Sequence, residues 1–255
     1  FLKFLKNNKD SRKVRQIFVT THSTHITSAV SLDEIICLHN DNGEVKVGYP
    51  SKVFPPDGKS LKYVQRFLDA TKSDMLFAQK VLFVEGLAEQ LLMSVFAQYL
   101  DKSLEDNHVA VINVGGRYFN HFLHMFDSTK PNTILKKIVC ITDIDPEYKK
   151  NPVAPDEDDE TKHFKKCYPF EFNANTTEYL YHQNLTPATY SAHLDISFYS
   201  QDSTYGKTLE YELVRCNPTF ELLVTGVMKN QSEIKRLMTA YRDGKGLDEI
   251  TGLMN

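Results

Sequence analysis

Four acidic residues stand where an α/β sheet would gather them. Glu85 directly follows the apolar run Val81–Val84, and Glu89 lies four residues later, on the same face of the helix expected next. Asp143 and Asp145 follow another apolar run, and side chains two apart in an extended segment point the same way. If the two runs are neighbouring strands, the carboxylates converge beyond their carboxyl ends, where open α/β sheets place their sites. Such a cluster needs cations to stay ionised, and hard oxygen ligands suit Mg²⁺ or Mn²⁺.

Each acidic residue also has a simpler interpretation. Glu85 and Glu89 would interact with the helix dipole or face solvent, and the two aspartates would cap a following loop. Any single residue of the four fits that description. The occurrence of all four together favours the metal site.

The elements that would position these residues alternate between strands and helices after residue 80. Before it we expect a strand over 15–21, a helix start at 22–25, strands over 35–38 and 44–49 joined by a turn at 41–43, a connector over 51–59 and a helix over 61–68. After it we expect strands over 81–84, 109–114, 137–142 and 196–199, helices over 87–100 and 117–126, and mainly helical sequence from Phe220. This alternation predicts an α/β fold with a mostly parallel sheet flanked by helices.

Composition narrows the class of protein. The chain has 255 residues, 41% of them hydrophobic and 25% charged, which excludes disorder throughout. The net charge of −3 requires a nucleic-acid partner to be held by local basic patches. The candidates for phosphate contact are Arg117, Lys136, Lys137, Lys207 and the region 229–245. The acidic run 155–160 is expected to form a solvated loop.

Cysteine usage and apolar run length bear on location. The four cysteines form no C-x-x-C pair, so we expect neither a zinc knuckle nor a disulfide framework, and a cytoplasmic location. The apolar runs are much shorter than the ~20 residues of a membrane span, so no membrane partner is predicted. The chain starts at Phe1 without a methionine and is expected to be a piece of a longer protein.

Three motifs in order resemble a known domain. Val81–Gly86 followed by Glu89, then Asn113–Gly116, then Ile141–Asp145 resemble the Toprim domain of topoisomerases, primases and several nucleases. The later segment Lys207–Leu213 is most similar to nucleases of the OLD (overcoming lysogenisation defect) family. In that family an ABC-type ATPase precedes the Toprim nuclease.

The resemblance implies a domain organisation. Residues 1–70 would be the last strands of an ABC-type ATPase domain, and 76–255 a Rossmann-like Toprim nuclease domain with a helical extension. The segment Thr20–Ser23 resembles the switch-histidine loop of such ATPases, in which His22 would contact the γ-phosphate of ATP. A loop or capping role for this histidine stays open. Because no Walker A motif occurs, ATP would be bound through the missing part of the ATPase, and this chain would not hydrolyse it.

The resemblance also implies a two-metal site. Glu85 and Glu89 would bind one metal ion, Asp143 would lie between the two, and Asp145 and Glu210 would bind the second. Two such cations can activate a water and stabilise the leaving oxygen of a phosphodiester.

Two lysines are candidates for a catalytic cation. If 207–210 is extended, Lys207 and Glu210 point to opposite faces, which favours Lys245. Lys245 lies between Gly244 and Gly246, and its segment resembles a Lys-Gly segment of OLD nucleases. A surface lysine without a role is the alternative.

A glycine pair follows the second expected strand. Gly115 and Gly116 would either let the backbone approach a phosphate or metal closely, or form a tight strand-to-helix turn. The sequence does not separate these interpretations.

The function implied is metal-dependent DNA endonuclease activity in anti-phage defence, regulated by an ATPase domain. A homo-oligomer and a helicase or other defence-system subunit are the expected partners. The alternatives are an RNA-processing Toprim nuclease and a non-catalytic metal-binding assembly module. A topoisomerase would need a nucleophilic tyrosine, and none of the 13 tyrosines stands in a fitting context.

Overall fold

The computed structural model divides into two compact units. It describes residues 7, 16–41, 43–144, 147–150, 164–167, 171–173, 175–180, 185–203, 206–217, 226–227, 229 and 231–246. The first unit comprises Phe1–Thr142 and Asn184–Tyr199, and the second comprises Asp143–Gln183 and Ser200–Asn255.

A four-stranded parallel sheet forms the centre of the first unit. Its strands are β3 (Lys80–Val84), β4 (Val109–Asn113), β5 (Lys137–Ile141) and β9 (Ile196–Tyr199), in the order β4-β3-β5-β9. Four of the five residues of β3 are buried, as expected for an apolar strand in the middle of a covered sheet. The predicted α/β class and the mostly parallel sheet are therefore confirmed.

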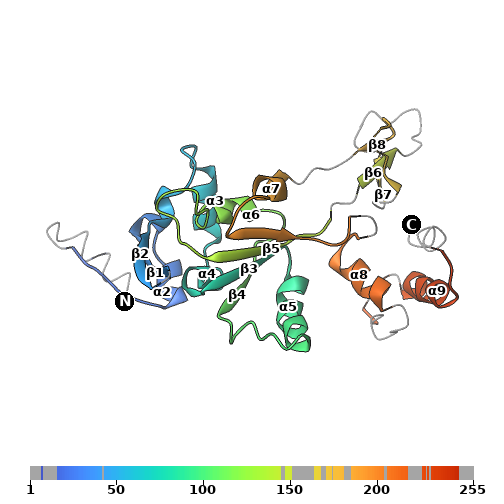
Figure 1. Cartoon of the computed structure of the whole chain (residues 1–255), viewed down its shortest axis with the longest axis horizontal. Coiled ribbons are helices and arrows are strands. Elements are labelled where there is room, and N and C mark those ends of the chain that lie inside the picture. Colours follow the sequence, from blue (N-terminus) through green and yellow to red (C-terminus); the bar gives the residue numbers. More distant parts are fainter. Residues whose placement is uncertain are drawn as a thin grey trace. The chain divides into compact units, whose positions relative to one another are not determined.

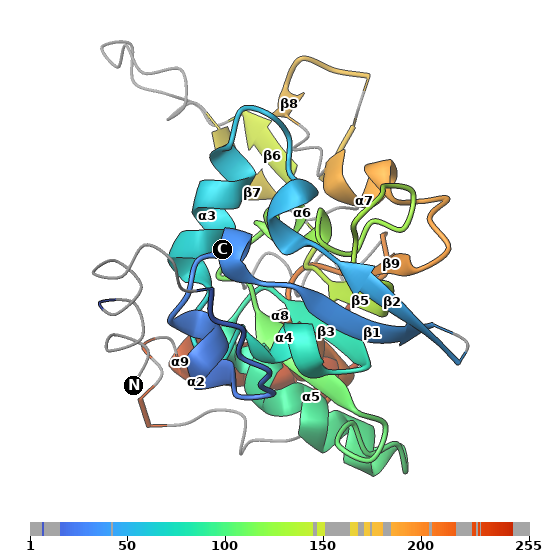
Figure 2. The ribbon, with the colours of Figure 1, turned by 90° about the vertical axis from the view of Figure 1, so that its left-hand side faces the viewer.

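Helices cover both faces of this sheet. α5 (Leu87–Tyr99) lies on one face, and α3 (Lys59–Phe67), α6 (Phe119–Leu123) and α7 (Leu185–Thr189) lie on the other (Figures 1 and 2). The second face holds an aromatic core in which the ring of Phe83 lies 6.0 Å from Phe122 and 6.1 Å from Phe126. All three rings are fully buried. Aromatic pairs at such distances add to the area that they bury.

The N-terminal part of the chain shares that core. It contains α2 (Thr24–Ser28), η1 (Leu32–Glu34), the antiparallel hairpin β1 (Cys37–Asp41) and β2 (Glu44–Gly48), η2 (Pro50–Lys52) and α4 (Asp74–Phe77). Figure 2 shows the two hairpin strands side by side. Leu32, Val53 and Val64 are buried in the same cluster as Phe83. The predicted hairpin and the helix over 61–68 are confirmed within one or two residues at most ends.

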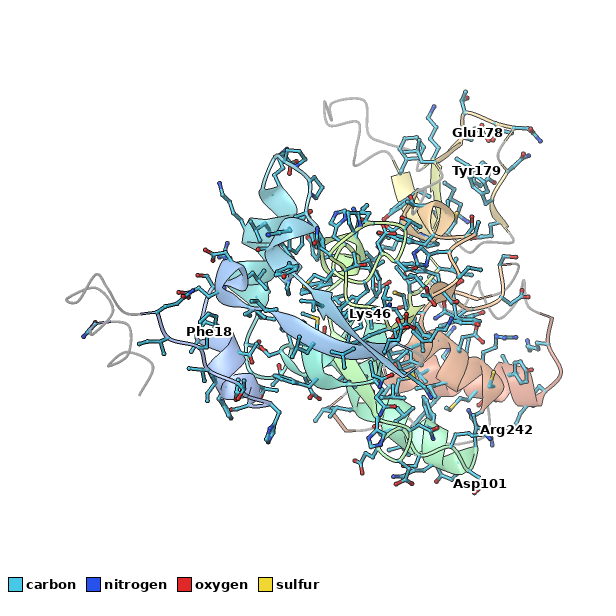
Figure 3. All side chains as sticks on the ribbon, turned by 60° about the vertical axis from the view of Figure 1, so that its left-hand side comes forward. Phe18, Lys46, Asp101, Glu178, Tyr179 and Arg242 are labelled. Carbon is cyan, nitrogen blue, oxygen red and sulfur yellow. The ribbon has the colours of Figure 1, made fainter. Side chains whose placement is uncertain are left out.

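The strand expected over 15–21 is wrong for the described residues 16–21. They form no regular element, and Phe18 is 78% exposed on this segment (Figure 3). A strand needs a neighbour for its backbone hydrogen bonds, and no described strand pairs with this segment. The helix start after it is confirmed, because the Ser23 hydroxyl accepts a hydrogen bond from the Ile26 amide and caps α2.

The second unit contains a small antiparallel sheet and two helices. Its strands are β6 (Glu147–Lys150), β7 (Phe164–Cys167) and β8 (Tyr179–Leu180), in the order β7-β6-β8. The helices are α8 (Leu209–Cys216) and α9 (Gln231–Arg242). The position of α9 confirms the helical prediction for part of the sequence after Phe220. The acidic run 155–160 lies outside the described residues.

The described helices are short. Within that part of the chain, none combines the length and apolar character that crossing a membrane requires.

Candidate active site

The carboxyl ends of β3 and β5 form the switch point of the parallel sheet. These two strands are adjacent, yet β3 connects onward to β4 on one side and β5 leads toward β9 on the other. Open α/β sheets bind their ligands at such a point. Glu85 directly follows β3 and Thr142 directly follows β5, so both residues stand at it.

Glu85 and Thr142 are joined there by a hydrogen bond. The Thr142 hydroxyl donates to Oε1 of Glu85. Thr142 is buried, Glu85 is half-buried, and the backbone of Thr142 is fixed because its amide donates to the Tyr199 carbonyl at 3.0 Å. The threonine therefore holds one oxygen of the glutamate in place. The sequence analysis did not single out Thr142, although it stands directly before Asp143.

Glu89 lies in the first turn of α5 and folds back toward the start of that helix. A Cβ atom added to Gly86 would stand 2.8 Å from Oε2 of Glu89, so the carboxylate occupies the space that a side chain at 86 would take. Glu89 is only 8% exposed. Within the described residues, no hydrogen bond or ion pair satisfies its carboxylate. A carboxylate that no protein group engages is available to bind a cation.

The two glycines after β4 form a tight turn against Glu85. Gly115 and Gly116 have φ angles of +75° and +110°, which glycine alone adopts readily. The Gly116 amide donates to the Glu85 carbonyl at 2.7 Å, and the Gly115 amide donates to Oδ1 of Asn113 at 2.7 Å. The turn is thus the structural role of both glycines, and it also leaves their backbone close to the main chain of Glu85.

Asp143 stands at the start of α8 within the second unit. Its Oδ1 accepts hydrogen bonds from the Leu209 amide at 3.1 Å and from Nε2 of Gln201 at 2.5 Å. Gln201 is fixed in turn, because its Oε1 accepts from the Ile144 amide at 2.8 Å. A carboxylate at a helix start is stabilised by the free amides and the helix dipole. Glu210, the residue after Leu209, is exposed in the first turn of the same helix.

The structure therefore groups the predicted ligands in two sets. Glu85 and Glu89 adjoin at the end of β3, and Asp143 and Glu210 adjoin at the start of α8. Asp145 lies outside the described residues. Among the described residues, no three histidine, cysteine or acidic side chains form a group able to hold a metal ion.

The two candidate catalytic lysines occupy different settings. Lys207 precedes a helix, so the expected extended strand over 207–210 is wrong, and with it the argument that Lys207 and Glu210 point apart. Burial, followed by the nearby charge of Lys166, lowers the pKa of Lys207. Lys245 is exposed just after α9.

The glycine before Lys245 ends helix α9. Gly244 has φ +71°, its amide donates to the Tyr241 carbonyl at 3.1 Å, and the Lys245 amide donates to the Ala240 carbonyl at 3.1 Å. This pair of bonds is a Schellman cap, which requires the left-handed conformation that glycine favours. Gly244 thus has a structural role that does not depend on a phosphate.

Two of the predicted phosphate contacts have partners within the protein, and for the first of them, Lys136, the prediction is wrong. Lys136 is buried, and its Nζ donates to the carbonyls of Met75, Leu76 and Ala78 at 2.9, 2.8 and 2.5 Å. Lys137 pairs with Asp195 at 2.6 Å. Both lysines stand at the amino end of β5, whereas Glu85 follows the carboxyl end of the parallel strand β3. The prediction did not take into account that these are opposite edges of the sheet. Arg117 follows the glycine turn at the carboxyl end of β4 and stays a candidate.

His22 is exposed in the segment before α2, next to the Ser23 cap. The contact of His22 with ATP stays a prediction.

The sheet order and the position of Glu85 at its switch point describe a parallel α/β domain with acidic residues at the carboxyl ends of its strands. Residues 76–145, which include β3, β4 and β5, match the family model described as "Overcoming lysogenization defect protein-like, TOPRIM domain". The resemblance drawn from the motifs is confirmed.

Several known proteins are similar to this chain. Endonuclease GajA of Bacillus cereus strain VD045 is 28% identical over 109 residues, 43% of this chain and 18% of that protein. GajA of strain HuB5-5 is 22% identical over 232 residues, 84% of this chain and 29% of that protein. The chain thus spans less than a third of either relative. The C-terminal region of the Burkholderia pseudomallei OLD protein has a TM-score of 0.40 at 19% identity, covering 70% of this chain and 81% of that one.

Proposed function

We propose that the chain is the nuclease part of an OLD-type protein and cleaves DNA by metal-dependent hydrolysis of phosphodiester bonds. The observation that carries the proposal is the position of Glu85, fixed by Thr142 at the switch point of an OLD-like Toprim domain. The two relatives are both named endonucleases, which supports the same activity.

The residues present fit divalent metal ions. The donor set consists of carboxylates, the hard oxygen ligands of Mg²⁺ and Mn²⁺. Glu89 adds a second carboxylate near the carboxyl end of β3, on a side chain that is only 8% exposed. We assign Glu85 and Glu89 to one metal ion, Asp145 and Glu210 to a second, and Asp143 to the position between them. When bound, such ions would activate water and neutralise charge on the phosphate.

The protein's own groups would hold these ligands in position. Thr142 restrains one oxygen of Glu85, and the Leu209 amide and Gln201 restrain one oxygen of Asp143. Outer hydrogen bonds of this kind orient metal ligands.

Lys245 supplies the proposed catalytic cation. Phosphodiester hydrolysis builds negative charge in the transition state, and a fixed cation beside that charge stabilises it more than the ground state. Lys245 is exposed just after the end of α9.

The wider setting is part of the same proposal. Residues 1–70 would end an ABC-type ATPase domain in which His22 contacts ATP bound mainly by the rest of that domain. The whole protein would act as a cytoplasmic homo-oligomer in defence against phage, with a helicase or other defence subunit as a further partner. The chain alone is not expected to turn over ATP, because it has no Walker A motif.

The test is cleavage of supercoiled plasmid by the purified 255-residue chain with Mg²⁺, Mn²⁺ or EDTA. We expect nicked or linear DNA only with metal, and loss of both products in Asp143→Asn with its thermal unfolding retained. Labelled DNA and RNA strands in one reaction separate the proposed DNA nuclease from an RNA-processing enzyme. Metal binding without cleavage of either strand would instead indicate a non-catalytic module.

A further inference from the structure

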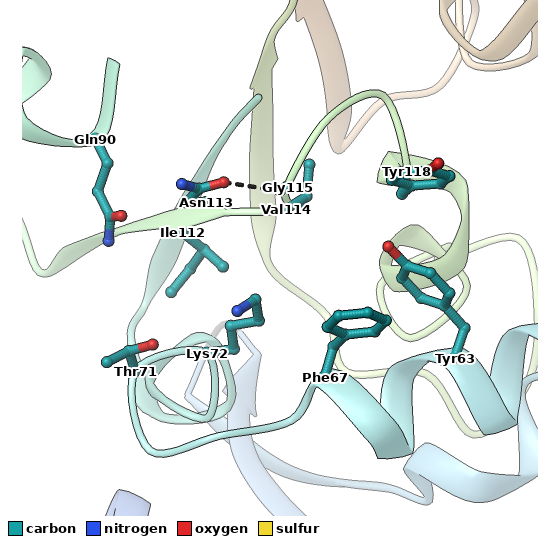
Figure 4. A pocket seen from close by; sticks show the side chains of 10 residues that line it. All are labelled: Tyr63, Phe67, Thr71, Lys72, Gln90, Ile112, Asn113, Val114, Gly115 and Tyr118. Carbon is teal, nitrogen blue, oxygen red and sulfur yellow. Dashed lines mark hydrogen bonds between the residues drawn. The ribbon is translucent and has the colours of Figure 1, made fainter. Parts of the chain in front are cut away.

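A cavity of about 390 Å³ lies in the first unit beside the end of β4. Figure 4 shows aromatic rings on one side of it and polar side chains on the other. The aromatic lining is Tyr63, Phe67 and Tyr118, and the polar lining is Thr71, Lys72, Gln90 and Asn113. This volume lies in the range of small-ligand sites.

The rings form a connected stack that the fold holds in place. The Tyr63 ring lies 4.6 Å from Phe67 and 5.4 Å from Tyr118. On its other side Tyr63 stacks on His121 at 4.2 Å, and Nδ1 of His121 is 2.9 Å from the Ser60 hydroxyl. Tyr118 and Phe67 are 51% and 38% exposed, and the Arg66 guanidinium lies 5.7 Å from the Phe67 ring, so Tyr118 presents the more open ring surface. Such surface offers a stacking platform for a flat ligand.

The polar side of the cavity is close to neutral. Lys72 is its only cation among the lining residues, and Nζ of Lys72 pairs with Asp69 at 3.2 Å. The side-chain oxygen of Asn113 accepts a hydrogen bond from the Gly115 amide, which leaves the Asn113 side-chain nitrogen as a donor. The side-chain nitrogen of Gln90 donates to the Val111 carbonyl at 3.5 Å, which leaves the Gln90 side-chain oxygen as an acceptor. Neutral donors and acceptors opposite aromatic rings suit the edge of a nucleobase better than a phosphate.

The cavity also adjoins the candidate active site. Its wall includes Asn113, Val114 and Gly115, and the next residue, Gly116, donates its amide to the Glu85 carbonyl at 2.7 Å. A group held in the cavity would therefore be separated from the main chain of Glu85 by one turn.

We propose that this cavity binds a single unpaired nucleobase, stacked on Tyr118 and Phe67 with its edge toward Asn113 and Gln90. The inference deepens the proposed function and rests on it, because a nuclease site supplies such a base next to the phosphate being cleaved. Stacking on aromatic side chains offsets the free-energy cost of unstacking one base and moving it into a protein pocket. A free mononucleotide would present the same chemistry.

The test is binding of a short single strand that carries one 2-aminopurine, measured by anisotropy and by base fluorescence in EDTA. We expect quenching of the base by the wild-type chain, and about 10-fold weaker binding for Tyr118→Leu and Phe67→Leu, since one base–aromatic stack contributes at least that much. Tyr99→Leu and Phe77→Leu are matched controls, because these residues are 84% and 37% exposed and line no part of the cavity. Both controls should bind within 2-fold of wild type, roughly the scatter expected of neutral surface changes.

A strand with an abasic site in place of the 2-aminopurine provides the second arm. We expect the wild type to bind the abasic strand about 10-fold less tightly than the intact strand. Each cavity variant should bind the intact and abasic strands equally tightly. Competition by deoxyadenosine monophosphate at the concentration of the strand would identify a free nucleotide as the occupant, and absence of competition would identify a base of the DNA. Wild-type binding by both cavity variants, or equal binding of the intact and abasic strands, overturns the proposal.

Because EDTA removes metal, this result does not depend on cleavage. A chain that never cleaves DNA but loses strand binding in the cavity variants would contradict the proposed nuclease function and keep the nucleobase site. A chain that cleaves normally and binds intact and abasic strands alike would support the proposed nuclease function and contradict the nucleobase site.

Discussion

The hydroxyl of Thr142 donates a hydrogen bond to the carboxylate of Glu85, and this bond ties the carboxyl end of β5 to that of β3. It lies at the point where the connections of the parallel sheet diverge. The next residue along the chain from Thr142 is Asp143, so the bond fixes the backbone that leads from one proposed ligand to another.

Thr142→Val should lower the cleavage rate about 10-fold and raise the Mg²⁺ concentration for half-maximal rate, because it removes the donor that positions Glu85 but keeps the volume of the side chain. Thr142→Ser keeps the hydroxyl and should restore the metal requirement of the wild type. Rates measured across a Mg²⁺ titration check this. An unchanged metal requirement in the valine variant would show that the bond does not position a ligand.

Gly86→Ala should displace the Glu89 carboxylate, since the new Cβ would stand 2.8 Å from Oε2. The backbone at Gly86 is extended, at φ −136° and ψ 179°, so alanine is tolerated there and the fold should persist. We expect cleavage to fall about 10-fold or more at fixed metal concentration. Gly226→Ala is the control, because a Cβ at that glycine meets nothing within 4 Å. Equal activity in the two variants would mean that the position of Glu89 is unimportant.

Lys245→Met should lower the single-turnover rate at saturating DNA about 100-fold, as loss of one group stabilising the transition-state charge typically does. Lys207→Met should act mainly on DNA affinity and its salt dependence. The rate at saturation separates the two effects. A wild-type rate in Lys245→Met would remove this lysine from the site.

Neighbouring lysines should differ sharply in their effect on stability. Lys136→Met leaves three carbonyls without their donor, two of them in fully buried bonds, and should lower the free energy of unfolding by about 2 kcal/mol or more. Lys137→Met removes an ion pair whose lysine side chain is 66% exposed, and should cost less than about 1 kcal/mol. Denaturant unfolding of both variants gives the comparison. Similar losses in the two would contradict the structural role assigned to Lys136.

The chain should lose stability as the pH falls below 6.5. Burial is the main cause that lowers the pKa values of His39, His121 and His124 below their usual 6.5. Between the folded and unfolded pKa values the unfolded chain binds more protons, so acid favours unfolding there. Asp127, with its pKa lowered to about 2, titrates well below this window.

Melting temperatures from pH 7.5 to 5 should therefore fall in the wild type and fall less in a His121→Gln, His124→Gln double variant. Parallel profiles for the two proteins would show that these histidines do not set the acid sensitivity.

The sequence pattern predicts the parallel sheet well, because β3, β4 and β5 are apolar runs that need burial on both faces. It fails for 16–21, where a run rich in β-branched residues has no described strand to pair with. It also gives no signal for β7, a four-residue strand with two lysines in its middle. Short polar strands depend on their partners more than on their own residues.

The candidate site shows the same division. The position of Glu85 follows from the end of an apolar strand, and the position of Glu89 follows from helical spacing. The bond from Thr142 depends on the register of β3 against β5, and the aromatic cavity joins α3 to the turn after β4. Neither relationship has a local sequence signal.

The proposed role of Glu85 as a ligand in a metal-dependent DNA nuclease is tested by single-turnover cleavage of DNA by Glu85→Gln with saturating Mn²⁺. Glu105→Gln, an exposed glutamate in the loop before β4, is the matched control. We expect wild-type cleavage in the control and none in Glu85→Gln, whose fold is retained and whose Mn²⁺-induced rise in melting temperature is reduced. Cleavage by Glu85→Gln at the wild-type rate, with an equal rise in melting temperature, would contradict it.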